Sequence, residues 1–362
     1  MNPTKTKPIV AAICAACVAA GCCGVPKILK DMPYIAPDHA AAPATESRDA
    51  FSPETIAAAI ARIDAVTGDE GSRGVVLASH GEIIWAGPDV DEKKHIWSCT
   101  KSFLSVCLGL LWDDGKISPD DLAAKYAPEF ADSMQGATIR HMATFTSGIN
   151  FDEKAWTIGA PNFPLGTAYH YSSTPDLLAL ILTRAAGMSL ADLFKQRIAI
   201  PLGIEDHEWD WRSARTDNGI TVNGGTGYTE SGVCMTPRAL AKFGMLFAND
   251  GVCDGKPLVS KRYLDLATQV RLPADTPMFD TKSWYASVAG RYGLNWWVNG
   301  PDVAGKVLWP HATPRTFAAQ GNQNNICIII PERRFVLARV SADKVIDISL
   351  FDEALEVLFP KK

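Results

Sequence analysis

Two side chains one helical turn apart, Ser98 and Lys101, have the types and the spacing that nucleophilic catalysis needs. A serine hydroxyl does not ionise at neutral pH, so a neighbouring base must take its proton. A lysine can be that base once burial or nearby positive charge lowers its pKa. Residues three apart at a helix start share one face, and the first turn offers N–H groups to an oxyanion. The pair therefore predicts an acyl-transfer site.

The residues that follow distinguish this pair from a second Ser-x-x-Lys pattern, at Ser341 and Lys344. A nearly continuous apolar run at 103–112 follows the first pair and predicts a buried helix, which would desolvate Lys101. Ser341 instead follows an expected strand, and we interpret its pattern as chance. Taken alone, the first pair is equally consistent with an N-cap serine beside a solvated lysine.

Two further segments supply candidate partners for the pair. Tyr171 lies on a loop before a helix start at Pro175, where its phenol can point into a cleft and relay a proton to a leaving group. Gly321 precedes a strand at 326–330, where a substrate can approach the backbone, and the N–H of Asn322 would be a second oxyanion donor. Taken alone, the first is also consistent with a packed loop tyrosine, and the second is better explained as a glycine bulge.

Strands at both ends of the chain enclose a helical middle. Residues 74–86 and 325–340 each have the pattern of a β-hairpin, and 346–359 has that of an amphipathic helix. Further helices are expected at 98–112, 118–126, 139–144, 175–186, 190–200, 237–249 and 260–267. We therefore predict an α+β fold, an antiparallel sheet of N- and C-terminal strands flanked by helices, with an all-helical subdomain inserted at about 115–300.

The first fifty residues differ in composition from the rest. A short basic stretch precedes an apolar run at 9–20, which is typical of a secretory signal over 1–22. The small residues before Cys22 also resemble a lipoprotein processing site, and lipidation of this cysteine, a cleaved signal and an uncleaved anchor are the alternatives. Residues 23–50, rich in Ala and Pro, are expected to link this segment to a folded domain at 51–362. We expect an exported protein, periplasmic or tethered to a membrane.

Composition limits the partners. The 362 residues carry a net charge of −5 and no Lys/Arg-rich run, so we expect no nucleic-acid binding. None of the cysteines beyond the signal region has the paired spacing of a zinc site. Their number is odd, so at least one is free or pairs between chains, and buried thiols or a Cys234–Cys253 disulfide are the alternatives. They are Cys99, Cys107, Cys234, Cys253 and Cys327.

Together these segments resemble the class C β-lactamase-like family of serine hydrolases, which is related to penicillin-binding proteins, from about Phe51 to the C-terminus. The resemblance implies a sheet flanked by helices, with the active site between it and a helical subdomain. It also implies that an ester or amide acylates Ser98, that water hydrolyses the acyl-enzyme, and that no metal or other cofactor takes part. The matching segments are Ile96-Trp-Ser-Cys-Thr-Lys-Ser-Phe, Asp114-Gly-Lys-Ile-Ser, Thr146-Ser-Gly, Tyr171-Ser-Ser, Pro201-Leu-Gly and Gly224-Gly-Thr-Gly.

The chain departs from this family at its substrate-binding positions. Ser173 replaces an Asn that hydrogen-bonds substrate amides, as in the branch with 6-aminohexanoate-oligomer hydrolases and some esterases. Ala319-Gln320-Gly321 replaces Lys-Thr-Gly, which removes a cation for a substrate carboxylate at a cost of about 2 kcal/mol in binding. Arg315 is a candidate replacement. Gln323-Asn324-Asn325 stands where relatives have Gly-Gly-Gln, which would narrow the site or alter the strand.

Three functions follow from these observations. The intact Ser98, Lys101 and Tyr171 set and the missing cation favour an esterase or amidase acting on a small substrate. Predicted export favours a cell-wall D-alanyl peptidase or β-lactamase. The altered third motif is also consistent with a non-catalytic ligand-binding or sensor protein on the same scaffold.

Overall fold

The computed structural model describes residues 51–68, 71–228, 230–280, 288–342 and 347–361. All of them belong to one unit, His39–Lys362. The expected signal at 1–22 and linker at 23–50 lie outside the described residues, so export, lipidation and the tether stay predictions.

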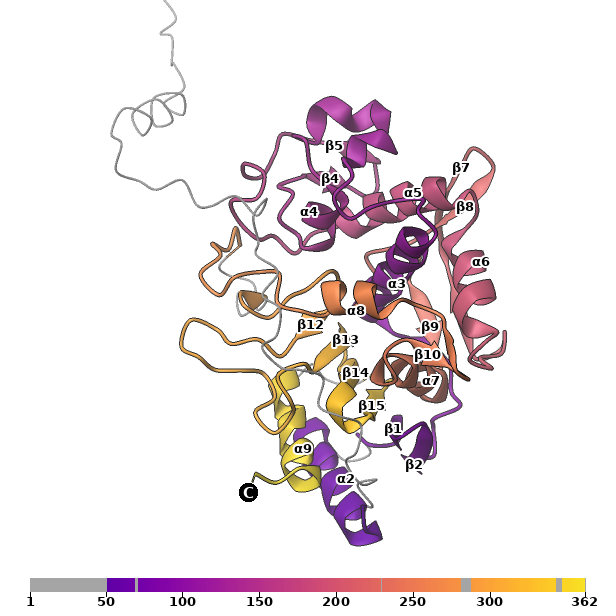
Figure 1. Ribbon diagram of the computed structural model, residues 1–362, viewed down its shortest axis with the longest axis vertical. Helices are drawn as coiled ribbons and strands as arrows, with labels where there is room; N and C mark the ends of the chain where they lie inside the picture. Colours follow the sequence, from indigo (N-terminus) through magenta and orange to yellow (C-terminus); the bar gives the residue numbers. More distant parts are fainter. Residues whose placement is uncertain (1–50, 69–70, 229, 281–287, 343–346, 362) are drawn as a thin grey trace, which may run out of the picture. The chain divides into compact units, whose positions relative to one another are not determined.

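A six-stranded antiparallel sheet joins the two ends of the chain, in the order β12-β13-β14-β15-β1-β2 (Figure 1). Both expected hairpins are confirmed, and β1 pairs directly with β15, with Leu77 opposite Leu337. The predicted antiparallel sheet of N- and C-terminal strands is therefore present. Its strands are β1 (Val75–Ser79), β2 (Glu82–Ala86), β12 (Trp297–Val298), β13 (Phe317–Gly321), β14 (Asn325–Ile330) and β15 (Phe335–Arg339).

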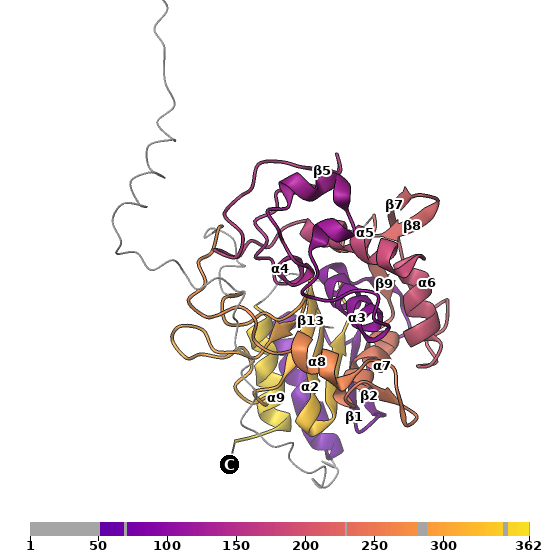
Figure 2. The ribbon, with the colours of Figure 1, turned by 45° about the horizontal axis from the view of Figure 1, so that its top comes forward.

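Helices cover both faces of this sheet, and alternate strand residues face each layer. On one face, α2 (Pro53–Thr67) and α9 (Asp352–Leu358) pack on the Leu77 and Ile328 side chains (Figures 1 and 2). On the other, α7 (Pro237–Ala248) packs on Val336 and its neighbours. The central strands are buried throughout, which explains their continuous apolar sequence.

The middle of the chain is largely helical, with short sheets between the helices. Its helices are α3 (Thr100–Asp113), α4 (Ile139–Ala143), α5 (Thr174–Ala186), α6 (Leu190–Phe194) and α8 (Lys261–Ala267). The short strands are β3 (Lys94–His95), β4 (Phe151–Asp152), β5 (Thr157–Ile158), β6 (Trp209–Trp211), β7 (Ser213–Asp217), β8 (Ile220–Asn223), β9 (Val233–Met235), β10 (Val252–Cys253) and β11 (Lys256–Pro257). Within the described residues, no single helix is long and apolar enough to span a membrane. The helices Thr174–Ala186 and Leu190–Ala199, which meet at a bend, have that length and apolar character only when they are counted as one.

Three element predictions differ from the structure. The helix expected at 118–126 is wrong: only a 3₁₀ turn at Ala123–Lys125 forms, because Leu122 pairs with Thr138 in an isolated β-bridge. The helix at 190–200 continues past α6 as a π-helical turn, Lys195–Ala199. The C-terminal helix starts at Asp352, after a 3₁₀ turn.

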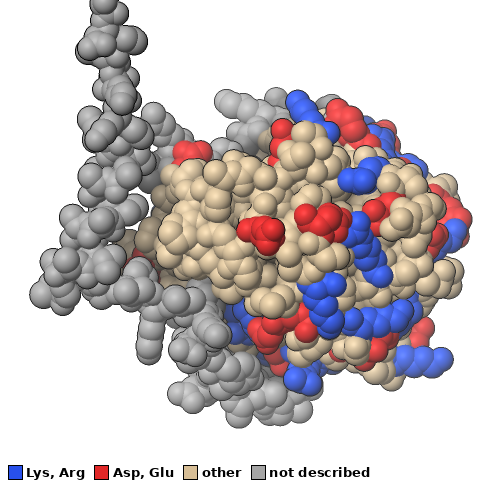
Figure 3. All heavy atoms as spheres, turned by 90° about the horizontal axis from the view of Figure 1, so that it is seen from above, with Lys and Arg blue, Asp and Glu red and all other residues tan. Residues whose placement is uncertain are grey.

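The five cysteines beyond the first fifty residues are free thiols, so the alternative of a Cys234–Cys253 disulfide is wrong. Four are buried and Cys253 is partly exposed. The face seen from the β4–β5 end shows a broad uncharged area, with Lys and Arg mixed among Asp and Glu along one side (Figure 3).

Candidate active site

Ser98 lies where the chain turns from a strand into a helix. β3 ends at His95, a 3₁₀ turn spans Trp97–Cys99, and α3 begins at Thr100. The sequence predicted this serine inside the α-helix, but the chain first reverses through Trp97, whose φ of 49° is left-handed. The turn presents the half-buried Ser98 at the N-terminal end of α3, which packs beside β13 (Figure 2).

Lys101 points back at Ser98. Its Nζ donates a hydrogen bond to the Ser98 Oγ at 2.8 Å and another to the carbonyl oxygen of Thr226. The side chain is only 2% exposed. Burial lowers the pKa of Lys101 to about 7, although the negative charge of Asp176 acts in the opposite direction. Near neutral pH, Lys101 is therefore uncharged in a large share of the molecules and can accept a proton.

Tyr171 forms the other side of the lysine. The Lys101 Nζ lies over the phenol ring, 4.6 Å from its centre, and the Phe145 ring packs against Tyr171 at 4.7 Å between centres. A cation over an aromatic face is stabilised by the ring quadrupole. The structure thus brings Ser98, Lys101 and Tyr171 together, with the ring face toward the ammonium.

Asp176 belongs to the same group and was missed by the sequence analysis. It lies in the first turn of α5, is 3% exposed, and its Oδ1 accepts the N–H groups of Gly225 at 2.7 Å and Thr226 at 3.0 Å. Burial raises the pKa of this carboxyl, while the hydrogen bonds from Thr226 and Gly225 and the charge of Lys101 lower it. The only sequence signal was an acidic residue after Thr174-Pro175, which is also what an ordinary helix start contains.

Gly321 ends β13 directly against the Ser98 turn. A Cβ on this residue would come 2.2 Å from the Ile96 carbonyl oxygen and 3.0 Å from the Ser98 nitrogen. A side chain there would push the strand and the serine apart. The glycine therefore allows the close approach of these two backbones, and Asn322 follows at the exposed edge.

Two expected substrate contacts have other partners in the structure. The Ser173 hydroxyl, 9% exposed, donates to the carbonyl oxygen of Phe151 at 2.7 Å, so that proton is already used within the fold. Arg315 binds Asp265 at 3.3 Å and lies before the opposite end of β13, about 20 Å along the strand from Gly321. It does not replace the missing cation.

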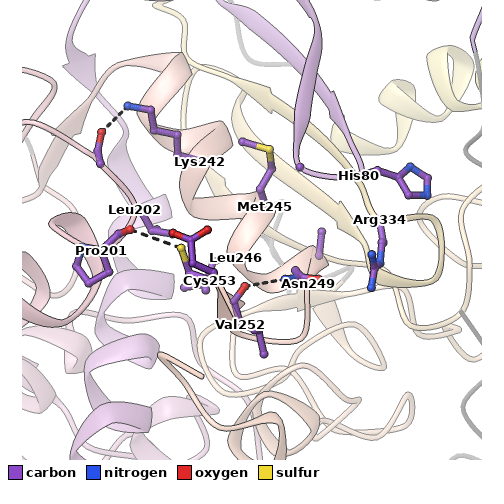
Figure 4. A pocket seen from close by; sticks show the side chains of 14 residues that line it. His80, Pro201, Leu202, Lys242, Met245, Leu246, Asn249, Val252, Cys253 and Arg334 are labelled. Carbon is purple, nitrogen blue, oxygen red and sulfur yellow. Dashed lines mark hydrogen bonds between the residues drawn. The ribbon is translucent and has the colours of Figure 1, made fainter. Parts of the chain in front are cut away.

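A separate hollow of about 550 Å³ lies at the other end of the sheet (Figure 4). The β14–β15 turn at Arg334 and the β1–β2 turn at His80 form one side of it, and Met245 of α7 lines it as well. Arg334 lies about 17 Å along the strands from the Gly321 end of the sheet. None of the residues around Ser98 lines this hollow, and we assign it no part in the chemistry.

The residues around Ser98 supply the parts that an acyl transfer requires. They combine a hydroxyl, a buried amine with a lowered pKa at hydrogen-bond distance, a phenol, and backbone N–H groups from two segments. Among the described residues, no group of three or more His, Cys, Asp or Glu side chains could hold a metal ion.

Comparison with known proteins places this arrangement in a family. The chain is similar to the 6-aminohexanoate-dimer hydrolase of Paenarthrobacter ureafaciens, 25% identical over 273 residues, which are 64% of this chain and 66% of that protein, slightly under two thirds. Its fold resembles a penicillin-binding protein homologue from Caulobacter crescentus (TM-score 0.63) and a family VIII carboxylesterase (TM-score 0.64), each 18% identical and covering 85% of this chain and 98% of theirs. The family model described as Beta-lactamase matches residues 59–350. The chain therefore belongs to the beta-lactamase family of hydrolases.

Proposed function

We propose that this protein is a serine hydrolase in which Ser98 is the nucleophile and Lys101 its base, acting on a small ester or amide. One observation carries the proposal: the Lys101 Nζ lies 2.8 Å from the Ser98 Oγ, on a side chain that is almost fully buried. Such an amine can take the hydroxyl proton as Ser98 attacks an acyl carbon.

The reaction follows in two steps. The Ser98 Oγ bonds to the carbonyl carbon while its proton passes to Lys101, and the oxyanion forms beside the N–H groups of Ser98 and Asn322. A proton relayed through Lys101 and Tyr171 leaves with the alcohol or amine, which gives an acyl-enzyme. Water then attacks the acyl carbon, loses its proton to the same base, and releases the acid and free Ser98.

The substrate class is inferred from the third motif. Ala319 is buried and uncharged at the position where the resemblance places a cation, and Arg315 is engaged elsewhere. A substrate whose carboxylate needs that cation would lose about 2 kcal/mol of binding. This favours a simple ester or a linear amide over a β-lactam or a D-alanyl peptide. The similarity to a 6-aminohexanoate-dimer hydrolase supports a linear amide as a candidate to test.

The test is covalent labelling followed by a substrate panel. A protein beginning near Phe51 is incubated with a fluorophosphonate, a penicillin and a reactive acyl ester, and intact mass is read for the parent, Ser98→Ala and Ser341→Ala. The last variant is the matched control, since Ser341 opens the second Ser-x-x-Lys pattern. One adduct on the parent and on Ser341→Ala, and none on Ser98→Ala, is the expected result. Absence of an adduct from all three reagents on folded parent protein would refute the proposal and favour a ligand-binding role.

The panel then separates the substrate classes. Turnover of p-nitrophenyl acetate and of the 6-aminohexanoate dimer is compared with that of a chromogenic cephalosporin and a D-Ala-D-Ala peptide. Faster turnover of the cephalosporin or the peptide would overturn the substrate assignment and leave the Ser98 chemistry intact.

A further inference from the structure

The turn after β13, residues 322–325, carries one of the two oxyanion donors and is tied to the residue before the nucleophile. The Trp97 Nε1 donates a hydrogen bond to the Gln323 Oε1 at 2.8 Å, across 226 positions of sequence. We propose that this hydrogen bond positions the Asn322 N–H relative to Ser98, so that Gln323 acts as a positioning residue for the oxyanion site. The inference rests on the proposed function, because it concerns the same acyl transfer.

The two ends of the link lie beside the two donors. Trp97 directly precedes Ser98, whose own N–H is the first donor, and Gln323 directly follows Asn322, whose N–H is the second. The two backbones also touch at Gly321, where a Cβ would come 3.0 Å from the Ser98 nitrogen. A change in the 322–325 turn therefore alters the spacing between the two N–H groups.

The rest of the turn is fixed from its other side. The buried Asn325 donates through Nδ2 to the Asn322 carbonyl oxygen at 2.6 Å, which fixes the peptide that joins Asn322 to Gln323. The buried Arg339 donates to the Asn324 carbonyl oxygen at 3.2 Å. Among the described residues, two hydrogen bonds join this turn to the nucleophile's segment. The Cys99 Sγ donates a long one, 3.5 Å, to the Asn325 carbonyl oxygen at the far end of the turn, and the shorter Trp97–Gln323 bond acts directly beside Asn322.

The backbone at Gln323 has a conformation that is unfavourable for a residue with a side chain. Gln323 and Asn324 both have φ of 58°, a left-handed conformation that glycine adopts freely and that is unfavourable for glutamine. In the family that the chain resembles, glycines stand at both of these positions. Asn tolerates this conformation better than most residues, so the strain falls mainly on Gln323, whose side chain is the one that binds Trp97. Trp97 is itself left-handed, at 49°, and its ring packs edge-on against His95 at 4.9 Å.

Gln323→Gly tests the inference because it cuts the link and relieves the strain at once. We expect kcat for the best ester to fall about ten-fold or more, with KM changed less than about two-fold and no loss of melting temperature. Trp97→Phe keeps a ring and loses the N–H, so it should lower kcat similarly. The double variant should be no worse than either single variant, because both remove one interaction.

Gln135→Gly is the matched control. Gln135 is an exposed glutamine with φ of 53°, so the substitution gives the same relief of strain away from Ser98. Its kcat should equal that of the parent. Multiplying losses in the double variant, an effect on KM alone, or parent-like kcat in both single variants would overturn the inference.

A readout without turnover separates this inference from the proposed function. In the ¹H–¹⁵N spectrum, the indole N–H signal that disappears in Trp97→Phe belongs to Trp97. It should move in Gln323→Gly and stay in place in Gln135→Gly. A parent protein that labels at Ser98 but shows no such shift refutes the link alone. A shift in a protein that none of the three reagents labels refutes the proposed function, and with it the catalytic role of the link.

Discussion

Asp176 and Lys101 are joined through the backbone of one loop. The Asp176 Oδ1 accepts the N–H groups of Gly225 and Thr226, and the Thr226 carbonyl oxygen accepts a hydrogen from the Lys101 Nζ. The carboxyl thus holds the loop that holds the lysine, and its charge also favours the ammonium form. Geometry and charge at the proposed base therefore depend on one buried residue of α5.

Asp176→Asn separates these two effects. The amide oxygen can still accept both backbone N–H groups, so the loop should stay in place, while the negative charge is lost. Since that charge raises the pKa of Lys101, its removal should lower this pKa and move the acid limb of the pH profile of kcat/KM to lower pH. Asp176→Ala leaves the two N–H groups without an acceptor and should cost about 2 to 4 kcal/mol of unfolding free energy.

The matched control for this pH profile is Asp217→Asn. Asp217 is also largely buried and pairs with Arg184 at 2.9 Å. Arg184 lies in the last turn of α5, whereas Asp176, whose charge acts on Lys101, lies in the first turn. Its profile should coincide with that of the parent. An acid limb that stays in place, or moves to higher pH, in Asp176→Asn would contradict the electrostatic role.

Burial of Lys101 should also be visible in stability. Its pKa is about 7 in the folded protein, against an ordinary value of 10.5, so the unfolded chain binds the proton more tightly between these pH values. The contribution of this titration to the free energy of unfolding is fully present above pH 10.5 and is lost as the pH falls toward 7. Parent protein should therefore gain about 2 to 3 kcal/mol relative to Lys101→Met between pH 7 and pH 9, as measured by urea unfolding. Lys154→Met, at an exposed lysine, should show no such trend.

The sequence predicted those features of the site and fold that depend on residues close together in the chain. The buried helix after Ser98 predicted a desolvated Lys101, and the two hairpins predicted the sheet. Asp176 could not be found in this way, because its partners at Gly225 and Thr226 are about fifty positions away. The same holds for the bond from Trp97 to Gln323. Such contacts depend on how distant segments pack, which a single chain's periodicity does not encode.

The wrong helix at 118–126 has a related cause. Its apolar spacing is helical, yet Leu122 is half-exposed and pairs with Thr138, while Tyr126 donates to Asp121 at 2.6 Å. Non-local pairing thus overrides a weak local preference. The sequence shows that Gln323 stands where relatives have a glycine. Its contact with Trp97 becomes apparent only from the backbone angles and the position of the indole ring.

Tyr171 has two separable parts, a hydroxyl that we propose as the proton relay and a ring that faces Lys101. Tyr171→Phe keeps the ring, so kcat should fall about a hundred-fold or more while the acid limb of the pH profile stays in place. Tyr171→Leu also removes the ring, which stabilises the ammonium form, so its acid limb should move to lower pH. Equal activity of Tyr171→Phe and parent would show that the phenol takes no part in proton transfer.

Gly321→Ala tests whether the contact between β13 and the Ser98 turn sets the reaction geometry. The new Cβ would lie 2.2 Å from the Ile96 carbonyl oxygen, closer than any real contact, and both neighbours are backbone, which moves only with its segment. We expect the strand and the serine to separate, with a loss of about 1 to 3 kcal/mol of unfolding free energy and a fall in kcat of about a hundred-fold. Gly159→Ala is the control, because the atom nearest to its Cβ would be the flexible side-chain amide of Asn150, at 3.0 Å, and the nearest backbone atom lies at an ordinary contact distance of 3.8 Å. If Gly321→Ala loses stability yet keeps its kcat, the close approach serves the fold alone, and the oxyanion donors must lie elsewhere.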